Sequence, residues 1–257
     1  MLSPVAGLIT MRISRIYLPL VQDDVFQKVL IHGEKAHYIK NVLRLKVDNT
    51  IHFFIPAGIE YQATITSITK HEITLQEISA INQQPQPSQL NTTLIQGISS
   101  SDRMDYSIQK AAELGCKRFF PVITDFCSHK VPKHKQEKKY QHWQAVSISA
   151  CEQSGRVDLM QVEPIQKLMQ VLEHIANALY LEPNAKHHIN QLPESFQIQQ
   201  NIIIGPEGGF SPSEIDHFAS KSYLGLQLGQ RVLRTETVAP VIMAALHALY
   251  GDFKPPQ

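Results

Sequence analysis

The first part of the chain alternates apolar and polar positions, the pattern of strands that bury one face. Ile51–Ile55, Tyr61–Ile68 and Glu72–Glu77 are rich in β-branched residues, and the segments PAG and TKH between them are typical of turns. This alternation predicts a small β-barrel over residues 12–80. The following segment, INQQPQPSQLN, is polar and aperiodic, so we expect a linker. We place the first domain at residues 11–82 and the linker at 83–89.

After Leu90 the apolar positions follow a different period. TTLIQGI predicts a buried strand, and DRMDYSIQKAAELGC has apolar residues at helical spacing with Gly115 as a helix stop. KRFFPVIT predicts another strand, and KYQHWQAVSISACEQSG predicts a helix that ends near Gly155. Three strand-then-turn units follow, NALYLEP, NIIIGPEGG and YLGLQLG. Strands that alternate with helices predict an α/β domain with a mainly parallel sheet over residues 90–257.

The composition is that of a globular protein without membrane segments. Of the 257 residues, 43% are hydrophobic and 18% are charged, and the formal net charge is +1. No run of about 18 uncharged apolar residues occurs, so we expect no membrane span. The first ten residues, MLSPVAGLIT, lack the pattern of a signal peptide, and we interpret them as an extension upstream of a natural start at Met11.

The cysteines and histidines do not indicate a metal site. Cys116, Cys127 and Cys151 are odd in number and widely spaced, so we expect reduced thiols in a cytoplasmic protein. The 12 histidines, including the pair His187–His188, lack the spacing of metal ligands, so we expect no bound metal.

Local charge is more informative than the total. The segment His129–Lys139 holds five lysines and two histidines against one glutamate, and we expect it to form an exposed loop. A second basic group lies early in the chain and comprises Arg12, Arg15, Lys40, Arg44 and Lys46. Single runs of this kind are usual on solvated surfaces, but two on one chain favour an anionic partner.

A glycine-rich loop, Gly205–Phe210, lies between a short apolar strand and a helix start. Ser211, Pro212 and Glu214 form a capping box with proline at the first helical position. The loop thus occupies the usual ligand position of open α/β sheets, where glycines allow close approach of a ligand. It lacks the lysine of a phosphate-binding P-loop and the spacing of a dinucleotide fingerprint. A simple tight turn remains the alternative.

A second polar stretch, LGQRVLRTETVAP, spans Leu228–Pro240 at another strand-to-helix junction. It combines a glycine, two arginines, two threonines and Glu236 with the apolar Val232 and Leu233. Such a turn would suit a flat ring that lies against backbone and the two apolar side chains. The alternative is a helix start whose arginines face solvent.

Together, IGPEGGFSPSE and LGQRVLRTETVAP closely resemble the RsmE family of SPOUT methyltransferases, which methylate N3 of a uridine in small-subunit (16S) ribosomal RNA. MRISRIYL and HYIKNVLRLKVDNTIHFF resemble the PUA-like barrel of that family, and SSSDRMDYSIQKAAELG, PVITDFCSHK and ISACEQSGR resemble its intermediate blocks. The resemblance implies an α/β domain whose end forms a deep trefoil knot and binds S-adenosylmethionine. It also implies a homodimer with the site at the subunit interface.

The resemblance further implies a set of site residues. The cofactor would contact three loops, with its adenine against Leu228, Val232 and Leu233; the full set is Leu181, Glu182, Pro183, Ile204, Gly205, Pro206, Glu207, Gly208, Gly209, Leu228, Gly229, Arg231, Val232, Leu233 and Thr235. Glu236 is the candidate acceptor of the uracil N3 proton, and Arg103 and Arg234 are candidates to stabilise the uracil anion. RNA contacts are expected from Arg12, Arg15, Arg44, Lys130, Lys133 and Arg156.

Two departures from the family pattern and several alternatives remain. Arg103 stands in SSSDRMDY where the family has a lysine, as in RGEKM, and VDLMQVEP after EQSGR lacks the expected R-x-P. Glu236 could instead cap its own helix. The protein could be an inactive RNA-binding or ribosome-assembly factor, or a SPOUT enzyme for another RNA or for a ribose hydroxyl.

Overall fold

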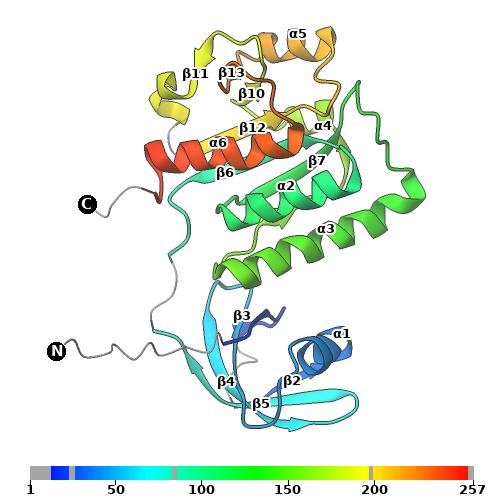
Figure 1. Ribbon diagram of the computed structural model, residues 1–257, viewed down its shortest axis with the longest axis vertical. Helices are drawn as coiled ribbons and strands as arrows, with labels where there is room; N and C mark the ends of the chain where they lie inside the picture. The colour runs from blue at the N-terminus through cyan, green and yellow to red at the C-terminus, as the bar shows by residue number, and fades with distance from the viewer. Residues whose placement is uncertain (1–12, 23–26, 83–85, 197–198, 254–257) are drawn as a thin grey trace, which may run out of the picture. The chain divides into compact units, whose positions relative to one another are not determined.

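The computed structural model describes residues 13–22, 27–82, 86–196 and 199–253, which form two compact units, residues 1–84 and 85–257 (Figure 1). Arg12 and the extension 1–10 lie outside the described residues. The domain boundaries predicted from the sequence, with a first domain that ends at 82 and a second that begins at 90, stay a prediction.

The N-terminal unit is a mixed five-stranded sheet in the order β1-β3-β4-β5-β2. Its strands are β1 (Arg15–Tyr17), β2 (Val29–His32), β3 (Thr50–Phe54), β4 (Glu60–Ile68) and β5 (Glu72–Ala80), with a short helix α1 (Gly33–His37) and a π-helical turn η2 (Tyr38–Val42). Among the described strands of this sheet, only β1 and β3 pair in parallel. The alternating residues predicted to be apolar, such as Ile51, Phe53 and Ile65, are fully buried in one core. The sheet is a half-barrel: its edge strands β1 and β2 are not paired with each other in the described residues.

The C-terminal unit is built on an eight-stranded parallel sheet in the order β11-β13-β10-β12-β6-β7-β8, with β9 also on β7. The strands are β6 (Asn91–Gly97), β7 (Arg118–Ile123), β8 (Gln161–Val162), β9 (Gln166–Lys167), β10 (Leu179–Leu181), β11 (His187–His188), β12 (Gln199–Ile204) and β13 (Leu224–Gln227). The helices are α2 (Ser101–Glu113), α3 (Lys133–Ser154), α4 (Leu168–Leu172), α5 (Pro212–Ser220) and α6 (Thr235–Tyr250), with 3-10 turns η3 (Ile189–Gln191) and η4 (Glu194–Phe196). The parallel α/β prediction is confirmed.

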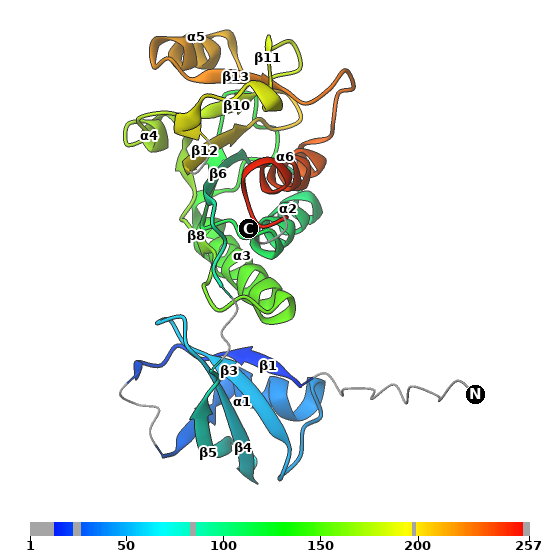
Figure 2. The ribbon, with the colours of Figure 1, turned by 90° about the vertical axis from the view of Figure 1, so that its left-hand side faces the viewer.

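Two groups of helices cover the sheet. Helix α2 packs against α3 and α6 on one face, and Figure 2 shows this group opposite α4. Phe218 of α5 shares a buried cluster with Leu168 and Val171 of α4. Because both faces of the central strands are covered, β6 and β12 are buried along almost their whole length, as central strands of parallel sheets generally are. No helix of the described residues is long and apolar enough to cross a membrane.

Helix boundaries follow the predicted local chemistry, with one correction. Gly115 and Gly155 adopt positive φ angles of 80° and 87° directly after α2 and α3, a conformation that glycine reaches without strain. At the start of α5, Ser211 and Glu214 form the predicted capping box. The residues Lys133–Lys139, expected in a loop, instead form the first turns of α3. Lysine, glutamine and glutamate are good helix formers, and Pro132 sets the start without needing an N–H donor.

The strand order brings the two sequence motifs together. Strand β10 pairs in parallel with both β12 and β13, so the carboxyl ends of these three neighbours meet at one edge of the sheet. The loops that leave β10, β12 and β13 therefore lie side by side, although they are far apart in the sequence.

Candidate active site

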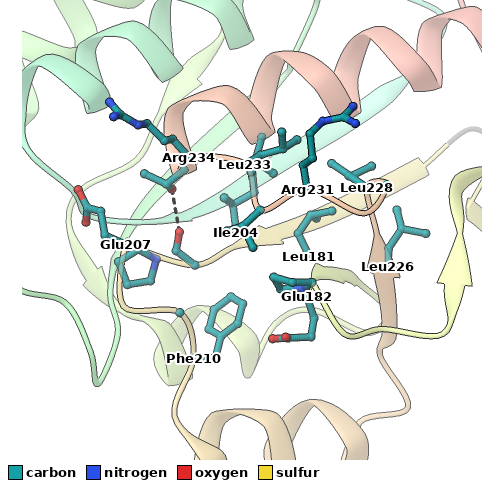
Figure 3. Close-up of a pocket in the computed structure, with 18 of the residues that line it drawn as sticks. Leu181, Glu182, Ile204, Glu207, Phe210, Leu226, Leu228, Arg231, Leu233 and Arg234 are labelled. Carbon is teal, nitrogen blue, oxygen red and sulfur yellow. Dashed lines mark hydrogen bonds between the residues drawn. The ribbon is translucent and has the colours of Figure 1, made fainter.

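A pocket of about 320 Å³ opens where these three loops meet (Figure 3). Its lining comprises Arg103, Leu181, Glu182, Pro183, Ile204, Gly205, Pro206, Glu207, Gly209, Phe210, Leu226, Leu228, Gly229, Arg231, Val232, Leu233, Arg234, Thr235 and Val238. Of the predicted cofactor-binding residues, all but Gly208 line it. That these residues contact a cofactor stays a prediction, but the fold does bring them to one cavity.

Hydrogen bonds between the loops hold the pocket in shape. The hydroxyl of Thr235, a buried side chain at the start of α6, donates to the carbonyl of Gly205 at 2.8 Å (Figure 3). On the other side, the Glu182 amide donates to the Leu226 carbonyl at 3.1 Å, and the Gln227 side chain donates to the Pro183 carbonyl at 2.8 Å. Each loop is thus tied to another loop of the pocket, which limits how far the cavity can change shape.

One wall of the pocket is apolar. Figure 3 shows Leu181, Leu226 and Leu228 on one side and Phe210 facing them across the cavity. The Phe210 ring packs edge-on against the buried ring of Phe218, with centroids 5.0 Å apart. A slot of this kind suits a flat aromatic ring held by van der Waals contact, while neighbouring backbone groups supply hydrogen bonds.

The rim of the pocket carries a charged cluster. Arg103 of α2 places Nη1 2.6 Å from Oε1 of Glu207 and Nε 3.5 Å from Oε1 of Glu236. Arg103 therefore joins α2, the glycine-rich loop and α6. The second carboxylate oxygen of Glu236, Oε2, is buried without a hydrogen-bond partner in the described structure. This atom therefore has unused capacity as a hydrogen-bond acceptor.

The pKa of Glu207 reflects this arrangement. Partial burial alone would raise the pKa of the carboxyl, but its own backbone N–H and the Arg103 guanidinium favour the charged form and lower the pKa below its ordinary value. Glu207 therefore remains a carboxylate that holds Arg103 in place.

The structure brings the three predicted catalytic residues to one region. Arg103 and Arg234 line the pocket. Glu236 is not among the lining residues, but its carboxylate contacts Arg103. Arg234 is exposed and has no ion-pair partner within the described ranges. Among the described residues, Glu236 makes no side-chain hydrogen bond to its own helix, but it lies in the first turn of α6, where a carboxylate is favoured, so the capping alternative stays open.

Gly208 is the predicted cofactor-binding residue that does not line the pocket. A Cβ atom built on Gly208 would lie 3.1 Å from both Cβ and the backbone oxygen of Phe126, on the loop between β7 and α3. Close packing of two loops therefore explains this glycine. Sequence reasoning missed Phe210, Leu226 and Val238 as pocket residues. Phe210 directly follows the glycine motif, whereas only the strand register identifies Leu226.

The predicted RNA-contacting residues fall into two groups. Arg44, Lys130 and Lys133 are exposed. By contrast, Arg15 is 11% exposed and pairs with Glu60 at 2.6 Å. The guanidinium of Arg156 is also internal, because it donates to the carbonyls of Ala112 and Cys116 and pairs with Asp158. In this chain Arg15 and Arg156 are committed to internal contacts, which is a correction to the expectation that they face RNA.

The cysteines and potential metal ligands give no second chemical site. All three cysteines are free and buried, and burial raises the pKa of the Cys116 thiol to about 11. Among the described residues, no group of three or more histidines, cysteines and carboxylates is placed to hold a metal ion.

The parallel sheet, the three-loop pocket and the preceding half-barrel define the class of protein, an RNA methyltransferase. Residues 86–247 match the family described as RNA methyltransferase domain, and residues 31–78 match the RNA methyltransferase PUA domain. The fold is of the SPOUT type.

Comparison with individual relatives shows which family of RNA methyltransferases the chain belongs to. The chain is 31% identical to the ribosomal RNA small subunit methyltransferase E of Buchnera aphidicola (subsp. Schizaphis graminum), over 94% of this chain and 98% of that protein. It is similar to the structure of the Neisseria gonorrhoeae ribosomal RNA small subunit methyltransferase E bound to S-adenosylmethionine, with a TM-score of 0.85, 33% identity and coverage of 94% and 100%. A Legionella pneumophila methyltransferase, also with bound S-adenosylmethionine, matches with a TM-score of 0.84, 32% identity and the same coverage. The chain belongs to the ribosomal RNA small subunit methyltransferase E family.

Proposed function

We propose that the protein transfers a methyl group from S-adenosylmethionine to N3 of a uridine in 16S ribosomal RNA. The observation that carries the proposal is the Arg103–Glu207–Glu236 cluster at the rim of the three-loop pocket. The similarity to two methyltransferase structures with bound S-adenosylmethionine supports the choice of cofactor.

The residues present fit this cofactor. The cavity of about 320 Å³ lies within the range of small-molecule sites. Leu228, Val232 and Leu233 would hold the adenine, and backbone groups of Gly205–Gly209 and Leu228–Thr235 would hydrogen-bond its polar edges. The Glu182 side chain lies at the same cavity and would accept from a ribose hydroxyl. When bound, S-adenosylmethionine supplies an electrophilic methyl group on a positively charged sulfur.

The protein's own residues then prepare the nucleophile. Uracil N3 carries a proton at neutral pH and becomes an effective nucleophile only when that proton leaves. Oε2 of Glu236 is the proposed acceptor, since it is buried without a hydrogen-bond partner among the described residues. Arg103 and Arg234 would stabilise the negative charge that develops on the uracil oxygens. The pocket walls align the reacting atoms.

The RNA, the assembly and the location complete the proposal. N3 is blocked in a Watson–Crick pair, so the target uridine must be presented unpaired. We place RNA contacts at Arg44 on the half-barrel and at Lys130 and Lys133, with the small ribosomal subunit as partner. A homodimer, a trefoil knot at the C-terminal end and a cytoplasmic location belong to the same proposal.

The test combines cofactor binding with detection of product. Calorimetry should show binding of S-adenosylmethionine to the wild type, and incubation with small ribosomal subunits that lack the modification should produce N3-methyluridine by mass spectrometry of the digested RNA. Glu236→Gln should bind the cofactor but lose at least about 100-fold in turnover, a typical effect of removing a general base. RNA binding without cofactor binding would instead support the inactive RNA-binding factor, and methylation at another atom would support a different SPOUT activity.

A further inference from the structure

A strip of exposed basic and aromatic side chains begins on the loop after β7 and continues along the first turns of α3. We call residues 126–139 the basic strip; its exposed members include Phe126, His129, Lys130, Lys133, His134, Lys135 and Lys138. Glu137 is the single acidic residue in this stretch of sequence. Within the described residues, none of these four lysines has an ion-pair partner. The strip therefore presents uncompensated positive charge.

The placement of these charges opposes helix stability. Helix α3 has no acidic residue in its first turn and no side-chain cap, and Lys133 and Lys135 lie there instead. The helix macrodipole disfavours cations at this end. The arrangement is therefore better explained by binding of an external anion than by folding.

The loop that begins the strip is fixed against the cofactor-side loop. The amide of Asp125 donates to Oε1 of Glu214 at 3.0 Å, and its carboxylate accepts from the hydroxyl of Ser211 at 2.6 Å. The next residue, Phe126, packs its Cβ and carbonyl against Gly208. Two residues of the strip's loop are thus attached to the segment that also forms the pocket.

The helical part of the strip is fixed to the helix that carries Arg103. Lys139 donates to the hydroxyl of Ser101, the first residue of α2. Farther along, Asp105 of α2 accepts from both His142 and Trp143 of α3, and Figure 1 shows the two helices side by side. The strip and the charged cluster at the pocket rim therefore belong to one connected surface.

Phe126 is unusual on this surface. Its side chain is 49% exposed although its backbone lies in close contact with the glycine-rich loop. An exposed aromatic ring beside a row of lysines is the combination that binds single-stranded nucleic acid, because the ring stacks on a base while the lysines neutralise phosphates.

We propose that the basic strip receives the single-stranded RNA segment that carries the target uridine, with the ring of Phe126 stacked on an unpaired base and Lys130 and Lys133 contacting phosphates. This inference rests on the proposed function and adds to it the path of the RNA into the pocket. Phe126 acts as a positioning residue: it holds the strand next to the pocket and takes no part in the chemical step.

The first test replaces the ring while keeping an apolar side chain at the contact with Gly208. Phe126→Leu should lower kcat/KM for unmodified small ribosomal subunits about tenfold or more, mainly through a higher KM for the RNA substrate, because leucine cannot stack on a base. Phe126→Trp should restore the rate. Phe253→Leu, at another exposed aromatic residue (58% exposed), is the matched control and should match wild type.

A structural role for Phe126 would give a different result. It would lower the melting temperature and weaken S-adenosylmethionine binding, and the tryptophan variant would not restore the rate. That outcome, or a Phe126→Leu variant as active as the wild type, would overturn the inference. The proposed function would still hold as long as the wild type methylates the subunit, so the two failures are distinguishable.

The second test uses salt dependence. Lys130→Gln with Lys133→Gln should reduce the slope of log K against log salt for single-stranded oligouridine by about 1.4, or about 0.7 for each phosphate that is no longer neutralised. The control exchanges two exposed lysines elsewhere in the same unit, Lys186→Gln with Lys221→Gln, and so removes the same charge. Equal slopes for the two double variants would refute a specific phosphate contact at the strip.

Discussion

The hydrogen bond between Thr235 and Gly205 allows the preorganisation of the pocket to be tested by replacing a single hydroxyl group with a methyl group. Thr235→Val keeps the branched shape but removes the hydroxyl, which donates at 2.8 Å to the carbonyl of the residue that follows β12. Thr235 is 6% exposed, so the missing bond is not replaced easily by water at the hydroxyl position.

The magnitude follows from the partial burial of this pair. A typical intramolecular hydrogen bond contributes about 1 kcal/mol net, and an orphaned buried carbonyl costs about 1–3 kcal/mol. Gly205 is only half-buried, so water can partly satisfy its carbonyl, and we expect the low end, about 1 kcal/mol. This corresponds to a decrease in melting temperature of about 2–4 °C for a protein of this size.

Cofactor affinity should change as well. If the bond preorganises the loops for binding, then in the variant the loops must be ordered when the cofactor binds. This costs about 1 kcal/mol of binding free energy and raises the Kd for S-adenosylmethionine about fivefold. Differential scanning fluorimetry and calorimetry measure the two effects. Thr237→Val, two residues along the same helix and without a side-chain hydrogen bond in the described structure, is the control. A Thr235→Val variant that matches this control in both assays would refute the reasoning.

Three further predictions concern other contacts. Glu207→Gln should lower the melting temperature at pH 7. Because the pKa of Glu207 is lowered in the folded protein, the stability that it contributes is present above its unfolded pKa of 4.5, and the difference from wild type should shrink as pH falls below that value; a difference independent of pH would contradict the assignment. Gly208→Val should displace the Phe126 loop and weaken cofactor binding at least tenfold by calorimetry, whereas Gly208→Ala, whose single methyl group requires Phe126 to move by only a few tenths of an ångström, should weaken binding much less. Arg156→Gln should destabilise the fold by about 1–2 kcal/mol, since the carbonyls of Ala112 and Cys116 lose their donor while Asp158 keeps Lys117 as a partner, yet should leave the salt slope of RNA binding unchanged; a reduced slope would show that Arg156 contacts RNA.

The sequence was sufficient for features whose cause is local. The capping box at Ser211, the helix stops at Gly115 and Gly155 and the strand before the glycine-rich loop depend on neighbouring residues, and all were predicted. The two motif loops were assigned to one site through the family resemblance, and the parallel pairing of β10, β12 and β13 supplies the physical reason.

Features that depend on distant partners could not be predicted in this way. Arg15 and Arg156 are indistinguishable from surface arginines until Glu60 and Asp158 are placed beside them. The exposed side chain of Phe126 became notable only when its backbone was found against Gly208. A basic run indicates charge but does not distinguish a loop from the first turns of a helix, which explains the error at Lys133–Lys139.

The charged groups around Arg103 give a reason why arginine, and not lysine, suits this position. A guanidinium directs several N–H groups in one plane, so Nη1 and Nε reach Glu207 and Glu236 at the same time, which a lysine ammonium on a single stem does less well. With both glutamates ionised, the cluster carries a net charge of −1, opposite to the sulfonium of the proposed cofactor. In the proposed reaction, methyl transfer would remove the sulfonium charge, and the proton from N3 would neutralise Glu236 at the same time. With Glu236 as the acceptor, the pocket would hold the same total charge before and after the reaction, which would avoid the cost of an uncompensated charge away from water.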